Sequence, residues 1–269
     1  MTAQWIIDVM EEWAPLNWAM ESDNVGLMVG DRNRSVSRVL TALDLSEAVL
    51  REAVKGRFDF IITHHPLFSR HIQPINSITA DTTLGKKLMT LIGNGIGLYS
   101  AHTNLDVAEG GVNDILFNML GLTNKEGLLL LNENNPPIGL IGYLQEAVSL
   151  QDLAKHVGAV LKYGHVRYAG RPEMPVKKVG LCGGNGTNPL FLKAALAKSC
   201  DVYITGDLTY HMSMDTQESG MALIDGTHYA TEIPIAEAIA ERIRSAAASK
   251  GYQIVVEKAE ADGQTFKSI

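Results

Sequence analysis

The stretch FDFIITHHPLFS, Phe58 to Ser69, decides the fold class of this chain. It opens as a mostly apolar strand and then places two adjacent histidines directly before a proline. Pro66 donates no backbone N–H and biases the residue before it toward an extended conformation, so it ends the strand. Because neighbouring side chains on a strand point to opposite faces, His64 and His65 can share a target only where the strand stops. This segment alone leaves the alternative open that both rings simply face solvent.

Helix-length segments separate further buried strands on both sides of this stretch. The strand Val39 to Leu45 precedes a helix that Ser46 caps, and IGLYSAH forms the next strand after a second helix. The second half repeats the scheme with the strands IGLIGYL, HVRYAG, KVGLC, VYIT and YQIVVEKA. Strands that alternate with helices predict an α/β protein with mainly parallel sheets.

A short internal match suggests that the two halves are related. The segment Asp59 to Thr63 aligns with Asp201 to Thr205, and each closes a strand–helix–strand unit with Ile-Thr before polar residues. A chance match remains the alternative. We therefore expect two related α/β lobes that face each other across a central metal-binding cleft, since ligands bind at the carboxyl ends of parallel strands.

The clearest linker-like turn is NENNPP, Asn132 to Pro137. It suggests a first lobe of residues 1–131 plus about 225–269, which carries most metal ligands, and a second lobe of residues 132–224.

Composition excludes several classes of protein. The net charge is −7, no Lys/Arg cluster stands out, and aromatic residues make up only 6% of the 269 residues, so we expect no nucleic-acid partner. The N-terminal MTAQWIIDVMEEW resembles an amphipathic helix rather than a signal peptide, and no apolar run is long enough for a membrane span. Cys182 and Cys200 have no metal-type spacing and are expected to be buried thiols. A cytoplasmic protein fits these features.

Polar clusters follow the predicted strands. They contain most of the eight histidines of the chain: His64 and His65 with His71 close behind, His102 with Asp106, His211 with Asp207, and His228 with Glu232. Imidazole and carboxylate ligands without nearby thiolates suit Zn, Fe, Mn, Co or Ni rather than a closed structural zinc site. His228 and Glu232 are four residues apart and would project from one helix face. This many ligands favours two ions over one.

Three motifs, THHPLFS, SAHTNLDVAEGGVND and GTHYATE, appear in an order that resembles the NIF-three-like family, also named GTP cyclohydrolase I type 2 homologues. ESDNVGLMVGD and ALDLSEAVLREAV match its N-terminal pattern, although Ser22 stands where the family usually has tryptophan. The resemblance covers essentially the whole chain. It implies two α/β lobes, a divalent metal pair in the cleft, and a homohexamer. Longer members insert an extra domain for which this chain has no room.

Carried over residue by residue, the resemblance implies five metal ligands, with Glu232 as the bridge between two ions: His64, His65, Asp106, His228 and Glu232. His102 and His211 are candidate catalytic residues. For His102, a further ligand, a partner that orients a ligand and a proton shuttle all stay open, and we favour a site-lining role. His211 is equally well explained as a helix-surface residue.

The glycine-rich turn Cys182 to Pro189 follows a strand and opens a helix, so it is the candidate phosphate site if one exists. It lacks the known nucleotide-binding fingerprints, and a tight strand-to-helix turn explains it better.

Two functions stay open at this stage. A metal-dependent hydrolase would act on a small molecule, with a nucleotide ring or a phosphoester as candidates, and the family name points to opening the imidazole ring of GTP. A metal-binding or regulatory partner protein without turnover would need the same ligands.

Overall fold

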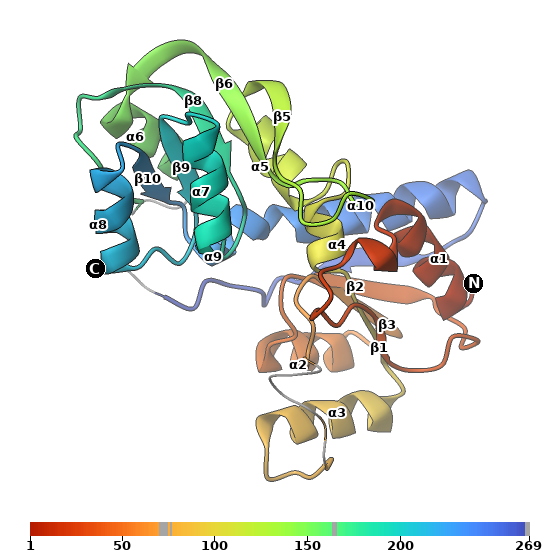
Figure 1. Cartoon of the computed structure of the whole chain (residues 1–269). Helices are drawn as coiled ribbons and strands as arrows, with labels where there is room; N and C mark the ends of the chain where they lie inside the picture. The colour runs from red at the N-terminus through yellow and green to blue at the C-terminus, as the bar shows by residue number, and fades with distance from the viewer. Residues whose placement is uncertain (70–74, 76, 163–165, 267–269) are drawn as a thin grey trace. The chain divides into compact units, whose positions relative to one another are not determined.

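The computed structural model describes residues 1–69, 75, 77–162 and 166–266 (Figure 1). The chain divides into two compact units. Unit 1 comprises Met1–Leu105 and Ile235–Gly263, and unit 2 comprises Asp106–Pro234 and Gln264–Ile269. Each unit contains one β-sheet with helices on its faces, which confirms the α/β class.

The sheet of unit 1 is parallel except at one edge. Its strand order is β1-β4-β3-β2-β11, and only the pairing of β1 with β4 is antiparallel. The central strands are buried, short and mostly β-branched or aliphatic, as expected for strands covered on both faces. The strands are β1 (Gly26–Val29), β2 (Arg38–Ala42), β3 (Phe60–Thr63), β4 (Gly97–Ser100) and β11 (Val255–Lys258).

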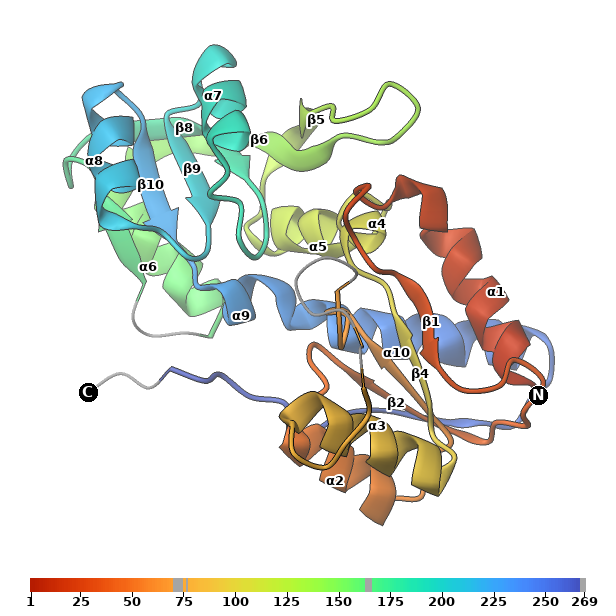
Figure 2. The same cartoon turned by 60° about the horizontal axis from the view of Figure 1, so that its bottom comes forward.

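Helices α2 (Glu47–Lys55) and α3 (Thr83–Asn94) cover one face of this sheet, and α1 (Ala3–Trp13) and α10 (Pro234–Ser249) cover the other (Figure 2). Ser46 accepts a hydrogen bond from Val49 N and begins α2, as the sequence predicts. The short helices η1 (Leu16–Trp18) and α4 (Thr103–Asp106) complete the helices of this part of the chain.

The sheet of unit 2 is mixed rather than mainly parallel. Its order is β5-β6-β8-β9-β10-β7, in which only β8-β9 and β9-β10 pair in parallel. The pairings β5-β6, β6-β8 and β10-β7 are antiparallel. The turn 132–137 lies in the loop of the hairpin β5-β6 and does not link two lobes. The strands are β5 (Thr123–Leu129), β6 (Ile138–Ser149), β7 (Arg167–Ala169), β8 (Pro175–Leu181), β9 (Val202–Thr205) and β10 (Ala222–Asp225).

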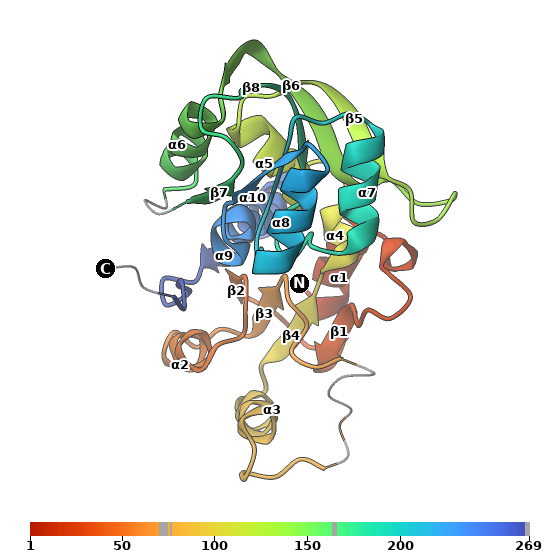
Figure 3. The same cartoon turned by 60° about the vertical axis from the view of Figure 1, so that its left-hand side comes forward.

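Two apolar clusters bury the two faces of this sheet. Helices α5 (Val112–Met119) and α6 (Leu150–Val160) pack in one cluster, while α7 (Pro189–Ala197) and α8 (Tyr210–Glu218) lie on the opposite face (Figure 3). The last helix of the unit is α9 (His228–Glu232). Cys182 and Cys200 are buried thiols here, as the sequence predicts.

Asp59 and Asp201, the first residues of the internal sequence match, make the same bonds in their own units. Asp59 Oδ2 accepts the backbone N–H groups of Ser37 and Arg38 at the start of β2. Asp201 Oδ2 accepts those of Lys177 and Lys178 in β8. Each therefore fixes the neighbouring strand directly before the point where the parallel pairing begins, at Val39 and at Val179, which supports a common origin of the strand–helix–strand units.

The chain passes between the units at Leu105–Asp106, at Pro234–Ile235 and again at Gly263–Gln264. From the sequence we expect the boundaries between the units after Leu131 and near residue 225, because the turn residues of the hairpin loop resemble a linker. No helix in the described part of the chain has the length and apolar character needed to cross a membrane.

Candidate metal centre

In unit 1 three parallel strands end side by side. Ala42 lies opposite Thr63, and Thr63 lies opposite Ser100, so the residues that follow these strands leave from one edge of the sheet. Thr63 is the last residue of β3, which places His64 and His65 directly beyond the strand, as predicted. Their backbone N–H groups still bond to the end of β2 and the residue after it, at 3.2 Å from Ala42 O and 3.0 Å from Leu43 O.

This edge brings together His64, His65 and His102. One ring nitrogen of each lies within 4.8 Å of the others. The ring centroids are 5.0 Å apart for His64 and His65, 5.1 Å for His64 and His102, and 5.5 Å for His65 and His102. His64 is fully buried, whereas the other two rings are half-buried. Three imidazoles at this spacing are suited to hold a transition-metal ion.

Each of these rings is held through its Nδ1 atom. His64 Nδ1 lies 2.8 Å from Ala101 O, and His65 Nδ1 lies 3.0 Å from Asp44 Oδ1. His102 Nδ1 lies 2.9 Å from Asp23 Oδ2. A carbonyl or carboxylate oxygen accepts the proton of Nδ1, so this contact fixes the tautomer and leaves Nε2 as the nitrogen that each ring offers to a cation.

Asp23 is the residue of this group that sequence reasoning missed. Its side chain is nearly buried and accepts hydrogen bonds from His102 and from both the backbone and the hydroxyl of Thr103, the latter at 2.6 Å. Burial alone would raise the pKa of Asp23, but these bonds hold it well below its usual range. The motif ESDNVG could have identified Asp23, since it places an acidic residue inside a family pattern.

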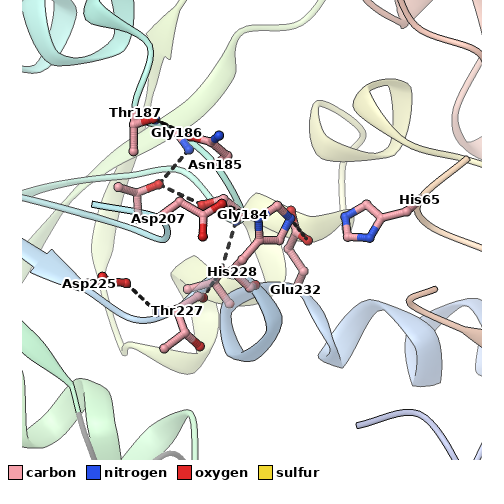
Figure 4. A network of polar contacts seen from close by, with 12 residues as sticks. His65, Gly184, Asn185, Gly186, Thr187, Asp207, Asp225, Thr227, His228 and Glu232 are labelled. Atoms are coloured by element: carbon pink, nitrogen blue, oxygen red, sulfur yellow. Dashed lines mark hydrogen bonds and ion pairs between the residues drawn. The ribbon is translucent and has the colours of Figure 1, made fainter. Parts of the chain in front are cut away.

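Unit 2 brings together the remaining predicted ligands. His228 Nε2 lies 3.1 Å from Glu232 Oε2, one turn later on α9, and the carboxylate oxygens of Asp106 and Glu232 lie within 4.8 Å of each other. Glu232 is 4% exposed. His228 Nδ1 contacts Asp207 Oδ2 at 2.7 Å (Figure 4), so Asp207 orients this ring as Asp44 orients His65.

The helix α9 begins at Thr227, whose side chain accepts a hydrogen bond from Ala230 N. Thr227 itself has a positive φ of 66° and donates its N–H to Asp225 Oδ1 at 3.0 Å. This start aligns the first helical turn so that positions 228 and 232 share a face, as the spacing predicts.

The glycine-rich turn lies against Glu232, and its backbone N–H groups donate to other side chains. The N–H groups of Gly183, Gly184 and Gly186 donate to the side chains of Asn113, Thr231 and Thr205 at 2.8–2.9 Å. Thr187 N and Leu190 N bond to asparagine side chains of the turn itself. These bonds favour the structural explanation of the turn over a phosphate site.

Gly184 lies against the carboxylate of Glu232. A Cβ atom at this position would lie 1.9 Å from Glu232 Oε1, and the residue has a positive φ of 61°. Only glycine therefore admits both the backbone conformation and the close approach. Asn113, which is 2% exposed, connects the two parts of the group: it donates to Asp106 O and accepts from Gly183 N, both at 2.9 Å.

The neighbouring thiol is kept neutral. Burial, followed by the charges of Asp106 and Glu232, raises the pKa of Cys182 far above its usual range. Cys182 also belongs to none of the groups that could hold a metal among the described residues, and these groups consist of histidine and carboxylate side chains, as the sequence indicates.

The other predicted histidines have separate places. His211 is exposed on α8, its ring edge-on to Tyr210, and it belongs to none of the groups that could hold a metal among the described residues. This location agrees with a helix-surface residue. His71 lies outside the described residues.

The chain is similar to known proteins along its full length. Residues 1–263 match the family described as Duf34/NIF3 (NGG1p interacting factor 3). A protein of Clostridium perfringens named GTP cyclohydrolase 1 type 2 homolog is 37% identical over 242 residues, which cover 89% of this chain and 90% of the relative. A protein of the same name from Methanocaldococcus jannaschii is 34% identical, over 87% of this chain and 91% of the relative.

Two solved structures share the fold. The Bacillus cereus protein related to NIF3 superposes with a TM-score of 0.91 at 25% identity and covers 100% of this chain and 99% of its own. Reduced HcgD from Methanocaldococcus jannaschii has a TM-score of 0.80 at 30% identity, with 97% and 98% of the two chains covered.

Proposed function

Because the chain belongs to the Duf34/NIF3 family and both of its units group histidine and carboxylate side chains, we propose that it is a divalent-metal-dependent hydrolase that binds two ions. The observation that carries this proposal is the common orientation of its histidines. His64, His65, His102 and His228 each engage Nδ1 with a carbonyl or carboxylate oxygen, so all four rings offer Nε2. Histidines that only serve packing have no reason to share this pattern.

The donor atoms fit first-row ions. Imidazole nitrogens with carboxylate oxygens suit Zn, Fe, Mn, Co or Ni, and Cys182 lies outside the groups that could hold a metal among the described residues. We propose His64, His65, Asp106, His228 and Glu232 as the ligands, as the sequence predicts, with His102 as a residue beside them. Divalent ions in such a site supply Lewis acidity and make a water nucleophile available near neutral pH.

The protein's own residues would orient and transfer protons. Asp44 and Asp207 hold the rings of His65 and His228 in place. His102, held by Asp23 at 2.9 Å, is our candidate to accept or return a proton at Nε2 during hydrolysis. The substrate would be a small molecule. A nucleotide is the first candidate, because the relatives carry the name GTP cyclohydrolase 1 type 2 homolog.

A turnover screen combined with elemental analysis tests the proposal. Metal-loaded protein is incubated with GTP, other nucleotides and phosphoesters, and the active substrate is then given to Glu232→Gln and to the control Glu241→Gln, an exposed glutamate of α10. We expect turnover to disappear in the first variant and to persist in the second, with both variants folded by circular dichroism.

Two results would replace the proposal. Bound metal without turnover on any substrate favours the alternative, a metal-binding or regulatory partner protein. Turnover that Glu232→Gln retains would remove this glutamate from the mechanism.

We also propose that the protein is a homo-oligomer, a hexamer by family resemblance. Light scattering should then give about six times the chain mass of 29.2 kDa, and a monomer at micromolar concentration would contradict it.

A further inference from the structure

Unit 2 contains a cavity of about 670 Å³ that none of the proposed metal ligands lines. It lies between α8 and the strands β7 and β10, the edge pair of the sheet. Its volume is in the range of small-molecule sites. The residues that the argument uses are Arg167, Asp225, Tyr168, Tyr210, Met214 and Glu218.

An anchored cation lies at one end of the cavity. Arg167 is opposite Asp225 in the antiparallel pair β7-β10, and its guanidinium Nη2 pairs with Asp225 Oδ2. The Asp225 side chain is 4% exposed, whereas that of Arg167 is 74% exposed. The buried carboxylate therefore fixes the guanidinium, and the remaining N–H groups of its planar fork can face an incoming oxyanion.

The same cavity has an apolar wall, which consists of Tyr168, Tyr210 and Met214. Tyr210 and Met214 lie four residues apart on α8, and Tyr168 follows Arg167 on β7. Tyr210 is 76% exposed at the first position of the helix, with its ring edge-on to that of His211 at 5.2 Å between centroids. An aromatic ring held at a cavity entrance offers a face for a flat ligand.

The cavity has a cation, Arg167, at one end and a carboxylate, Glu218, at the other. Because β9 and β10 are parallel, α8 must run back along them, so Tyr210 lies at the carboxyl edge of the strands with Asp225. Glu218 ends the helix eight residues later, about 12 Å away at the rise of an α-helix. Its carboxylate can accept hydrogen bonds at the end remote from Arg167.

We propose that this cavity binds a small organic anion, with a carboxylate or phosphate on Arg167, a flat body against Tyr210 and Met214, and N–H donors toward Glu218. This goes beyond the metal-dependent activity, since binding here needs no metal. The cavity starts at the edge of the sheet from which Asp207 and His228 leave, because Leu208 and Asp225 line it. In open α/β sheets this edge is where ligands bind.

Isothermal titration of the full chain in excess chelator tests the proposal. The probes are phenyl phosphate, 4-aminophenyl phosphate, benzoate and inorganic phosphate. We expect the two aryl phosphates to bind, the amino compound more tightly, and inorganic phosphate at least tenfold more weakly, because it lacks the flat body. Benzoate distinguishes a carboxylate site from a phosphate site.

Variants locate the binding. Arg167→Lys keeps a cation for Asp225 but loses the planar fork, and should weaken aryl phosphate binding at least tenfold. Tyr210→Ala, at an exposed position, should weaken it several-fold without unfolding. Arg171→Gln, an exposed arginine four residues from Arg167 and outside the cavity lining, is the control and should bind like the wild type.

Three outcomes would overturn the proposal. Equal weakening in Arg167→Lys and Arg171→Gln would mean non-specific attraction of anions. Binding that chelator abolishes would place the anion on the metals. Variants that change the oligomeric state in light scattering but leave aryl phosphate binding intact would assign this surface to an interface.

Discussion

At the scale of single residues, the two histidines that directly follow β3 have different environments. His64 is fully buried with Nδ1 on a backbone carbonyl, and His65 is half-buried with Nδ1 on Asp44. A ring held by a carboxylate is a more basic ligand than one held by a carbonyl. The two histidines are thus not equivalent, although they are adjacent in the sequence.

We expect His64→Ala and His65→Ala to empty different ion positions. The loss of His64 should remove mainly one ion and the loss of His65 mainly the other, because different partners, Ala101 O and Asp44 Oδ1, orient the two rings. Anomalous scattering from crystals of each variant measures this. His156→Ala, an exposed histidine of α6, is the control and should keep both ions. The same vacancy in both variants would indicate one shared ion.

Gly184 offers a second test at this scale. Gly184→Ala adds a Cβ atom that would lie 1.9 Å from Glu232 Oε1, so the carboxylate must move and metal content should fall. The positive φ alone costs about 1–2 kcal/mol for alanine. Gly121→Ala controls for that strain, since Gly121 has a φ of 68° and open space around its Cβ position.

Elemental analysis and chemical denaturation separate the two effects of Gly184→Ala. Without chelator only Gly184→Ala should lose metal, and it should lose more stability than Gly121→Ala; in excess chelator, where neither variant holds metal, the remaining losses measure the backbone strain and the displaced carboxylate. Equal metal content in the two variants would remove the glycine-rich turn from the site.

At the scale of elements, Asp59 and Asp201 bind β2 and β8 in the same way, directly before the point where each parallel pairing begins. Replacing either by alanine should destabilise its unit by about 1–3 kcal/mol, because two backbone N–H groups lose a charged acceptor. Burial alone would raise the pKa of Asp59, but the bonds from Ser37 and Arg38 lower it below its usual range.

The sign of the pH dependence follows from that shift. A depressed carboxyl pKa stabilises the fold above the unfolded value of about 3.9, and the stabilisation disappears as the pH falls through the lower folded value. Denaturation of wild type and Asp59→Ala should therefore differ most near neutral pH and converge in acid. A difference that grows in acid would contradict the assignment.

The sequence predicts elements better than it predicts pairing. The strand that begins near Val39, the strand that ends before His64 and the helix cap at Ser46 lie where their sequence patterns place them, because local propensity decides them. The hairpin β5-β6 was missed, since Asn132 to Pro137 carries turn residues that serve a linker and a hairpin equally well. Pairing depends on contacts between distant segments.

The residues of the candidate metal centre were likewise predicted only where the evidence is local in the sequence. His64, His65, His228 and Glu232 follow strand ends and were predicted from spacing and resemblance. Asp23 and Asn113 were missed, because each acts through a partner about 70–80 residues away in the sequence. Only the fold brings such partners together.

At the scale of the whole molecule, each unit has its own core and its own group of predicted ligands. Two of the crossings between the units lie next to ligands: one directly before Asp106, and one at Pro234–Ile235, two residues after Glu232. Asp106 and Glu232 therefore belong to the segments of chain that connect the two units. Metal binding should therefore contribute to the stability of the protein as a whole.

Chelation measures that contribution. A ligand that binds only the folded state at 100 times its Kd stabilises it by about 2.7 kcal/mol. For chains of this size, 1 kcal/mol shifts the Tm by about 2–4 °C, so removing one ion should lower it by about 5–10 °C. Thermal unfolding followed by circular dichroism, with and without chelator, tests this on metal-loaded protein.

Glu232→Gln distinguishes a loss of metal from a direct effect of the chelator. This variant replaces a 4% exposed carboxylate by a neutral amide of the same shape, so it should unfold at a temperature near that of the chelated wild type and respond little to chelator. Glu241→Gln should behave like the wild type in both conditions. If metal-loaded wild type unfolds at the same temperature with and without chelator, the ions do not hold the folded state. The histidine and carboxylate groups would then bind metal without stabilising the fold.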